Sequence, residues 1–346
     1  MFQDIALQTL FQLKKEEDHT LIDVRSPKEF METTIPGSIN IPVFNDGERA
    51  EIGTLYKQQG PEVAKERGLE IFSAKLPDFI AECRQIDTPL TVFCWRGGMR
   101  SKTAATVLDL MGMHVNRLNG GIRSYREWVV ITLEKQAFNP QLIVINGYTG
   151  AGKTMILQAL TKRHYPVIDL EGMAQHRGSI FGQIGIIPSN QKNFESQLVQ
   201  KLIQYQDEPY VFIEGESKRI GRATVPDFLF DKKENSTQIF VDIPLEVRVE
   251  NILEEYQPWE HSKEFIDAFQ IIKKRIHTPV AKEVELDLRS GSYRHAVELL
   301  LTYYYDPKYN HSTSFPDEKK LHIQAETIAD AVDKIEQLVQ NSVVDK

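Results

Sequence analysis

One of the two cysteines, Cys94, lies where an apolar run meets a glycine-rich loop that contains two arginines. The segment reads TVFCWRGGMRS over residues 91–101, so we expect a strand to end at the cysteine and a helix to begin near Ser101. Backbone N–H groups, a helix N-terminus and guanidinium charge at one sulfur favour the thiolate form. We predict that Cys94 is a catalytic nucleophile in a loop that can hold an anion. The predicted anion-binding residues of this loop are Arg96, Gly97, Gly98 and Arg100.

A second motif, GYTGAGKT at residues 147–154, fits the phosphate-binding pattern G-x-x-x-x-G-K-[ST] at every position. An apolar run precedes it and a helical pattern follows it, which is the context that this motif needs. Its glycines let backbone N–H groups turn inward around a phosphate. We expect the lysine to bridge phosphate oxygens and the threonine hydroxyl to be available to Mg²⁺. The residues assigned to diphosphate binding are Gly147, Gly150, Gly152, Lys153 and Thr154.

Two acidic residues lie in predicted strands downstream of this motif. Glu214 closes the run YVFIE, where proteins with a phosphate-binding loop usually place an acid that acts through magnesium. Asp169 belongs to the predicted strand 167–170. A plain turn residue is the alternative for both positions. The motif indicates phosphate or diphosphate rather than ATP hydrolysis, and we assign no certain metal site.

The net charge of −8 argues against indiscriminate nucleic-acid binding, but a local basic surface can still contact RNA. Two short clusters are candidates for tRNA or phosphate contacts, and a solvated charged face is the alternative for each. The residues are His176, Arg177, Lys218, Arg219 and Arg222.

The elements that position these motifs alternate between strands and helices, which predicts two mainly parallel α/β sheets. We place the first domain at residues 1–138, with a linker helix from about 123, and the second at 139–346, with a helical C-terminal part. The main strand predictions are 20–24, 90–93, 114–118, 142–145, 167–170, 210–214, 238–242 and 321–324.

Several classes of protein are disfavoured by what the sequence lacks. No run approaches the ~20 apolar residues of a membrane span, and the first residues do not resemble a secretory signal. Two cysteines without a histidine cluster make a disulfide framework and a zinc site improbable. We therefore expect a cytoplasmic protein that uses its thiol in a reducing compartment and carries no tightly bound cofactor.

Four segments together resemble the rhodanese domain: LIDVRSPKEF at 21–30, IPGSINIP at 35–42, the Cys94 loop, and LNGG at 118–121. A rhodanese domain followed by a P-loop domain resembles the tRNA 2-selenouridine synthase family. The Cys94 loop resembles that family's own version of the rhodanese loop, and so do residues 51–57, 176–182 and 304–307. The resemblance covers nearly the whole chain and implies a rhodanese-like domain joined to a P-loop NTPase-like domain.

This resemblance implies an activity on tRNA. The family replaces the sulfur of wobble 2-thiouridine in the anticodon arm with selenium from selenophosphate. The route is expected to pass through S-geranyl-2-thiouridine, which is made from geranyl diphosphate. The cysteine, here Cys94, is expected to carry selenium as S-selanylcysteine, and the P-loop is expected to clamp the diphosphate. A role for Mg²⁺ and the oligomeric state stay open.

Five residues separate Cys94 from Arg100, whereas common sulfur-transferring rhodanese loops have one fewer. A loop of this length resembles that of cysteine phosphatases on the same fold and suits the phosphate of selenophosphate, gripped by Arg96 or Arg100. The alternative is a wider turn that only accommodates Gly97 and Gly98. A cysteine phosphatase or a sulfurtransferase, fused to a P-loop kinase-like domain, is the competing function. Phe93 stands where such phosphatases commonly have histidine.

The sequence does not locate the channel for the geranyl chain. The apolar residues Ile184, Ile186 and Ile187 are one candidate, and membership of the ordinary core is the alternative.

Overall fold

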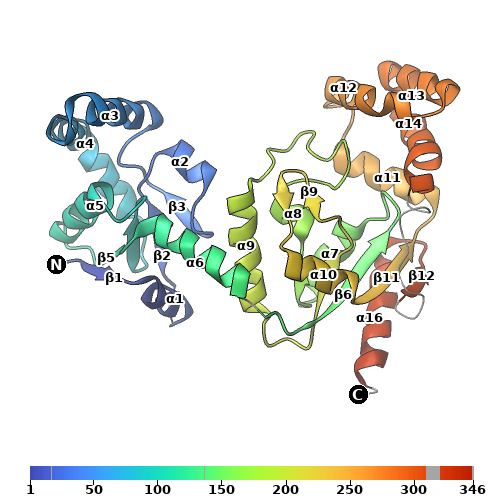
Figure 1. Cartoon of the computed structure of the whole chain (residues 1–346), viewed down its shortest axis with the longest axis horizontal. Helices are drawn as coiled ribbons and strands as arrows, with labels where there is room; N and C mark the ends of the chain where they lie inside the picture. The colour runs from blue at the N-terminus through green and yellow to red at the C-terminus, as the bar shows by residue number, and fades with distance from the viewer. Residues whose placement is uncertain (17, 136, 309–319, 345–346) are drawn as a thin grey trace. The chain divides into compact units, whose positions relative to one another are not determined.

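The computed structural model describes residues 1–16, 18–135, 137–308 and 320–344. It divides into two compact units, Met1–Gln136 with Glu195–Val199 and Ala137–Phe194 with Gln200–Lys346. Each unit is built on a five-stranded sheet in which every neighbouring pair of strands is parallel (Figure 1). The predicted α/β class is confirmed.

The sheet of the first unit has the order β1-β5-β4-β2-β3, so β4 is the central strand. All four residues of β4 are buried, and three of them, Leu90, Val92 and Phe93, are apolar. The elements are β1 (Gln3–Ile5), α1 (Leu7–Glu16), β2 (Thr20–Asp23), α2 (Pro27–Glu32), β3 (Ser38–Asn40), α3 (Asp46–Gln59), α4 (Pro61–Cys83), β4 (Leu90–Phe93), α5 (Met99–Leu110), β5 (Val115–Leu118) and α6 (Gly121–Lys135).

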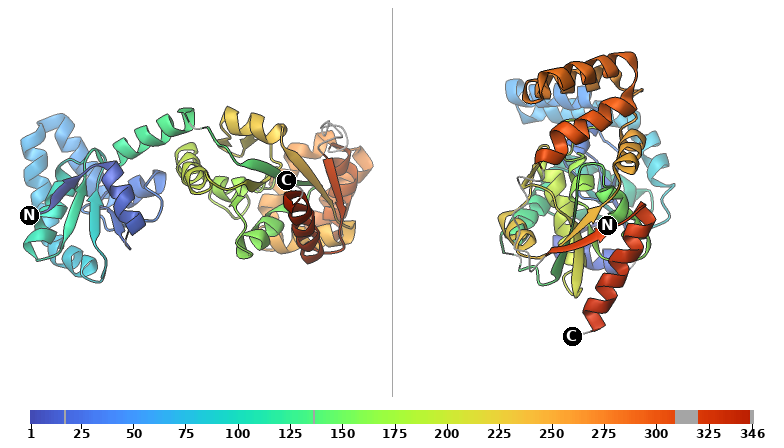
Figure 2. Two further views of the ribbon diagram at one scale, coloured as in Figure 1. Left: turned by 90° about the horizontal axis from the view of Figure 1, so that it is seen from below. Right: turned by 90° about the vertical axis from the view of Figure 1, so that its right-hand side faces the viewer.

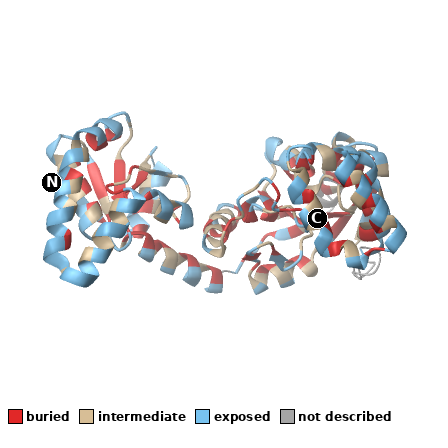
Figure 3. Ribbon diagram, turned by 90° about the horizontal axis from the view of Figure 1, so that it is seen from above, coloured by how far each residue is buried: buried red, intermediate tan, exposed pale blue. Residues whose placement is uncertain are grey.

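Burial follows the layers of this unit: the strands form a buried centre, and the helices expose their outer faces (Figure 3). α3 was not predicted, because none of its residues is fully buried and its sequence has no clear apolar stripe. It lies along α4, and the pair contributes apolar side chains to the cluster that also contains Cys94.

The sheet of the second unit has the order β12-β11-β6-β8-β7, with β6 at its centre. A separate two-stranded antiparallel pair is formed by β9 and β10. The elements are β6 (Gln141–Gly147), α7 (Lys153–Lys162), β7 (Val167–Ile168), α8 (Leu170–Ala174), α9 (Gln191–Gln204), β8 (Tyr210–Glu214), β9 (Arg219–Ile220), β10 (Ala223–Thr224), α10 (Asp227–Glu234), β11 (Thr237–Asp242), α11 (Leu245–Tyr256), α12 (Ser262–Ile272), the 3₁₀ helix η1 (Lys273–Arg275), α13 (Thr278–Ser290), α14 (Tyr293–Leu300), the π-helical turn η2 (Leu301–Tyr305), β12 (Lys320–Gln324) and α16 (Ile328–Val344).

The predicted helical part of the second unit comprises α12, α13 and α14, which share a separate apolar cluster. The helical stretch over 280–305 is divided, because Gly291 ends α13 in the left-handed conformation with φ of 82°. α16 lies beside α7 and β12, as the red helix and strand in Figure 2 show. Among the described residues, no helix combines the length and apolar character that a membrane span needs.

Both predicted motifs follow the central strand of a parallel sheet. Cys94 comes directly after β4, and the phosphate-binding loop runs from the end of β6 to the start of α7. Parallel sheets bind ligands in the crevice at the carboxyl ends of their strands. The fold therefore places each motif where α/β proteins build their sites.

Candidate functional site

The Cys94 side chain is enclosed at the base of its loop and contacts polar groups there. Cys94 is 3% exposed, and its Sγ lies 3.1 Å from Ser101 Oγ in the first turn of α5. The Ser101 hydroxyl also lies 3.3 Å from the Gly98 carbonyl oxygen. Ser101 was predicted only as the start of the helix, and the structure adds it to the site as a hydrogen-bonding partner of the sulfur.

The loop presents a continuous set of backbone donors. Among the described residues, none accepts a hydrogen bond from the backbone N–H groups of residues 95–101. The helix that follows begins at Met99, so its first N–H groups belong to this set. N–H groups in a loop at a helix N-terminus form an anion-binding site. The anion-binding loop predicted from the sequence therefore has the donors that it needs.

The two arginines of the loop occupy different environments. Arg100 donates from both terminal nitrogens to Glu29 of α2, at 2.5 and 3.1 Å, so a carboxylate already engages its guanidinium. Arg96 is exposed and makes no hydrogen bond or ion pair with any described residue. Of the two, only Arg96 can turn toward an anion without giving up an ion pair.

A third arginine, which the sequence reasoning missed, also supports the loop. Arg117 of β5 donates from Nη1 to the Gly97 carbonyl oxygen at 2.8 Å and pairs with Asp4 at 2.6 Å. The hydrogen bond to Asp4 raises the pKa of Arg117, and the charge of the Cys94 sulfur acts in the same direction. No signal near Cys94 in the sequence pointed to this residue, because it reaches the loop from the neighbouring strand.

Glycine is required where the loop meets the start of α6. Gly121 has φ of 56°, and a Cβ there would lie 2.2 Å from the Cys94 carbonyl oxygen. The Ile122 N–H donates to that same oxygen at 2.9 Å. The Gly120-Gly121 pair in the LNGG segment thus allows α6 to begin against the cysteine loop.

The second cysteine is a structural residue. Cys83 is fully buried at the end of α4, and burial raises the pKa of its thiol to about 12. The two thiols belong to the same apolar cluster but differ in their polar contacts, because the Cys94 sulfur also lies 3.1 Å from the Ser101 hydroxyl.

In the second unit, the P-loop lies against a group of carboxylates. Lys153 Nζ is 3.3 Å from Glu216 Oε1, and Thr154 Oγ1 donates to Glu171 Oε2 at 3.2 Å. Gly178 brings the backbone against both acids: a Cβ there would lie 2.2 Å from Glu171 and 2.9 Å from Glu216. Sequence reasoning missed Glu216, since it comes from a different segment than the P-loop.

The buried acids carry strongly perturbed protonation equilibria. Burial, reinforced by the charge of Glu216, raises the pKa of Glu171 to about 8. Burial also raises the pKa of Glu214, which ends β8 as predicted and accepts a hydrogen bond from the Glu171 N–H. The other carboxylate oxygen of Glu214, Oε2, is buried and accepts no hydrogen bond from a described donor, and the Glu214 carboxyl group lies beside that of Asp169.

Asp169 differs from its prediction as a strand residue. β7 stops at Ile168, and Asp169 caps α8 by accepting a hydrogen bond from the Gly172 N–H at 2.7 Å. Burial raises its pKa. Within the described ranges, no group of three or more His, Cys, Asp or Glu side chains is arranged to hold a metal ion.

Two side chains of helix α11 donate hydrogen bonds to the backbone of the P-loop. Arg248 is 4% exposed, donates from Nε to the Thr149 carbonyl oxygen at 3.0 Å, and forms a bidentate pair with Asp306 at 2.6 and 3.0 Å. Asn251 donates to the Gly150 carbonyl oxygen at 2.9 Å. Asp306, part of the segment 304–307, thus acts on the P-loop through Arg248.

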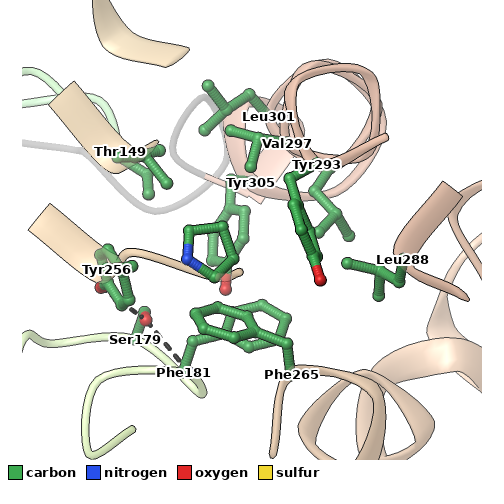
Figure 4. Close-up of a pocket in the computed structure, with 13 residues that line it drawn as sticks. Thr149, Ser179, Phe181, Tyr256, Phe265, Leu288, Tyr293, Val297, Leu301 and Tyr305 are labelled. Atoms are coloured by element: carbon green, nitrogen blue, oxygen red, sulfur yellow. Dashed lines mark hydrogen bonds between the residues drawn. The ribbon is translucent and has the colours of Figure 1, made fainter. Parts of the chain in front are cut away.

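An apolar pocket adjoins the P-loop at Thr149 (Figure 4). The rings of Phe181 and Phe265 stack on one side of it, with centroids 5.4 Å apart. Its empty volume is about 530 Å³, solvent-open mouth included. The lining residues are Thr149, Ser179, Phe181, Ile252, Tyr256, Pro258, Phe265, Leu288, Tyr293, Val297, Leu300, Leu301 and Tyr305.

The isoleucines suggested for a hydrocarbon channel do not line this pocket. Ile184 is buried in the apolar cluster of the helical part, and Ile187 is 77% exposed. Ile186 is half-buried and is not among the lining residues. The neighbouring residues Ser179 and Phe181 do line the pocket, so the sequence reasoning was a few residues away from it.

The predicted tRNA or phosphate contacts separate into two groups. Lys218, Arg219 and Arg222 are exposed around β9 and β10, and Lys218 pairs with Asp227 at 2.8 Å. This group stays a prediction.

His176 and Arg177 point into the unit instead. Burial lowers the pKa of His176, and Arg177 lies 3.3 Å from Glu255 with its guanidinium over the Tyr256 ring. Their position favours a structural role beside the P-loop over a contact with RNA.

Comparison with known proteins supports the reading of both units. Residues 7–127 match the rhodanese-like domain, and residues 140–278 match the tRNA 2-selenouridine synthase AAA domain. The tRNA 2-selenouridine synthase of Nitrosomonas europaea is 32% identical, over 84% of this chain and 88% of the relative. That of Aeromonas salmonicida is 34% identical, over 85% and 87%. A solved rhodanese-related protein from Thermoplasma volcanium is 22% identical and covers 37% of this chain and 93% of its own, with a TM-score of 0.24.

The two matched domains together span most of the chain, in the order expected from the motifs. Relatives above 30% identity align with both of them. The chain therefore belongs to the tRNA 2-selenouridine synthase family.

Proposed function

We propose that this protein replaces the sulfur of a 2-thiouridine in tRNA with selenium, in two steps that use the two sites separately. The P-loop site transfers a geranyl group from geranyl diphosphate to the sulfur. The Cys94 site then exchanges the S-geranyl group for selenium from selenophosphate. The observation that carries the proposal is the apolar pocket that shares Thr149 with the P-loop. A diphosphate cradle with a hydrocarbon-lined pocket beside it suits a prenyl diphosphate better than a nucleotide.

In the first step the thiouridine sulfur attacks the diphosphate-bearing carbon of the geranyl chain. The carbon–oxygen bond breaks, and its electron pair leaves with diphosphate. Lys153 and the backbone N–H groups of the P-loop would stabilise the charge that develops on this leaving group. Lys153 would exchange its contact with Glu216 for the diphosphate. The aromatic pocket would hold the chain and keep water from the reacting carbon.

A divalent ion fits this site as a companion of the diphosphate. The Thr154 hydroxyl and the Glu171 carboxylate are neighbouring oxygen ligands, and the buried Glu214 Oε2 accepts no hydrogen bond from a described donor. Mg²⁺ prefers oxygen ligands and usually binds through substrate phosphates with few protein ligands. When bound there, it would neutralise charge on the leaving diphosphate.

In the second step selenium becomes bonded to C2 of the base, and the carbon–sulfur bond breaks. The electron pair of that bond leaves with the geranylthiol, and water then cleaves the selenium–phosphorus bond, which releases phosphate and leaves selenium on C2. S-geranylation makes this exchange feasible, because a thiolate bearing a hydrocarbon chain is a better leaving group than the sulfur of a thiocarbonyl. Selenium would pass to the base directly from selenophosphate at the selenide level, because S-selanylcysteine at Cys94 would need a two-electron oxidant. The Cys94 loop would hold the donor, with the N–H groups of residues 95–101 and Arg96 on its phosphate.

The experiment uses two substrates and one variant. Wild-type protein is incubated with selenophosphate and either thiouridine tRNA plus geranyl diphosphate or tRNA already geranylated, and the nucleosides are identified by mass spectrometry. Lys153→Ala should abolish geranylation and leave selenation of the geranylated tRNA intact. Lys162→Ala, at the exposed end of the same helix, is the matched control. Normal geranylation by Lys153→Ala would contradict the assignment of the P-loop.

The competing phosphatase function has one observation in its favour, the set of N–H donors around Cys94. Against it, the arginine at the end of the loop, Arg100, is engaged by Glu29. Release of phosphate from an aryl phosphate without tRNA, lost in Cys94→Ser, would favour the phosphatase.

A further inference from the structure

A cleft in the first unit has no role in the two sites described above. It lies between α3, α4 and the start of α5, and its empty volume is about 1810 Å³ with its open mouth included. The segment 51–57, which resembles the family but has had no assigned role, forms part of its wall. The lining residues are Val43, Phe44, Arg49, Ala50, Ile52, Gly53, Thr54, Tyr56, Lys57, Pro61, Ala64, Lys65, Gly68, Leu69, Phe72, Met99, Arg100 and Thr103.

The cleft begins at the Cys94 loop. Met99 and Arg100, which open α5, are lining residues, and they follow Cys94 by five and six positions. The buried floor residues Phe44 and Phe72 belong to the same apolar cluster as Cys94. A group attached to a base whose reacting atom is at Cys94 would therefore have this floor within reach.

The walls of the cleft are apolar and open to solvent. Tyr56 is 61% exposed, Leu69 67% and Met99 60%. Large apolar side chains that gather at an open cleft mark a binding surface more often than isolated ones do. A hydrocarbon group that covers them would bury apolar area and bind favourably.

The charged residues of the cleft are all basic. Its lining contains Arg49, Lys57, Lys65 and Arg100 and no acidic side chain, but Glu29 pairs with Arg49 and Arg100, and Glu62 pairs with Lys65. Lys57 forms no ion pair with a described residue. A basic rim around an apolar floor complements a ligand that carries both phosphates and a hydrocarbon, and an RNA with a prenylated base has this composition.

We propose that this cleft receives the S-geranyl group of the tRNA intermediate while selenium replaces it at the Cys94 loop, with the basic rim on the RNA phosphates. This inference rests on the proposed two-step function. Because the departing sulfur is bonded both to the base and to the prenyl chain, the chain must lie beside the cysteine when exchange occurs. The protein then has two hydrocarbon sites: the pocket at Thr149 for the donor and this cleft for the intermediate.

The test compares selenation of RNA stem-loops that carry either S-geranyl- or S-methyl-2-thiouridine, using the full chain and selenophosphate. Leu69→Gln makes the exposed wall polar and should raise KM for the geranylated RNA about tenfold, without changing KM for the methylated RNA. The matched control is Leu110→Gln, the same change at a leucine that is 77% exposed in the same unit but outside the cleft. Geranylation of thiouridine RNA should be unaffected by either substitution.

Three outcomes separate this inference from the proposed function. Equal KM values for Leu69→Gln and wild type on geranylated RNA would overturn the cleft assignment and leave the two-step function standing. Failure of the wild type to convert geranylated RNA would overturn the function and, with it, the occupant of the cleft. A change in oligomeric state in Leu69→Gln with unchanged KM would show that the cleft binds another copy of the chain, which also overturns the assignment.

Discussion

Replacing Glu171 by glutamine removes a carboxyl whose pKa burial raises from an ordinary 4.5 to about 8. In the unfolded chain that carboxyl loses its proton near pH 4.5. The folded state holds the proton more tightly, so the contribution of Glu171 to stability is fully present below pH 4.5 and is lost as pH rises toward 8. One pKa unit corresponds to 1.36 kcal/mol, so the loss is about 3 kcal/mol by pH 7 and about 5 kcal/mol above pH 8. Glutamine does not titrate and escapes this loss.

Glu171→Gln should therefore become progressively more stable than wild type between pH 5 and pH 8. The assay is urea denaturation at four pH values, with pulse proteolysis and mass spectrometry of β6 and β8 peptides to follow the second unit alone. Glu254→Gln, the same change at an exposed position on α11, controls for the loss of one negative charge. A stability difference between Glu171→Gln and wild type that stays constant within about 1 kcal/mol over this range would refute the reasoning.

Two further predictions follow from the packing. Arg248→Met leaves Asp306 without its partner and removes the hydrogen bond to the Thr149 carbonyl oxygen, so it should destabilise the second unit by about 3–5 kcal/mol. It should also weaken the binding of inorganic diphosphate, which calorimetry measures. Unchanged diphosphate affinity would show that Arg248 does not position the P-loop. Iodoacetamide at pH 7 should label Cys94 far faster than Cys83, because the Cys83 thiol, with a pKa of about 12, is only about one part in 10⁵ thiolate at that pH. The labelling of each cysteine is measured by peptide mass spectrometry. Comparable labelling of the two would contradict the assignment of Cys83 as structural.

The parts of the two sites that are local in sequence could be predicted from it. A strand, a glycine-rich loop and a helix suffice to recognise the Cys94 loop and the P-loop, because their chemistry depends on consecutive backbone groups. Glu214 was predicted for the same reason, since the end of an apolar strand is visible in the pattern. The central position of β4 and β6 agrees with their mainly apolar sequences.

The remaining site residues depend on contacts between distant segments. Arg100 meets Glu29 across 71 positions, and Arg248 reaches the carbonyl of Thr149 across 99, which no local pattern can indicate. Asp169 was misread because an aspartate after an apolar pair fits a strand end as well as a helix cap, and only the hydrogen bond to Gly172 distinguishes them.

The face that α11 turns toward the P-loop has a consequence for how the second unit binds its ligand. Arg248 and Asn251 hold the loop, and Ile252 and Tyr256, on the following turns, line the apolar pocket. One helix thus contacts both the P-loop and the apolar pocket, so in the proposed complex with a prenyl diphosphate the binding free energies of the diphosphate and of the chain would be linked through it. By reciprocity, a short alkyl alcohol in the pocket must alter the affinity for inorganic diphosphate by the same factor as diphosphate alters the affinity for the alcohol.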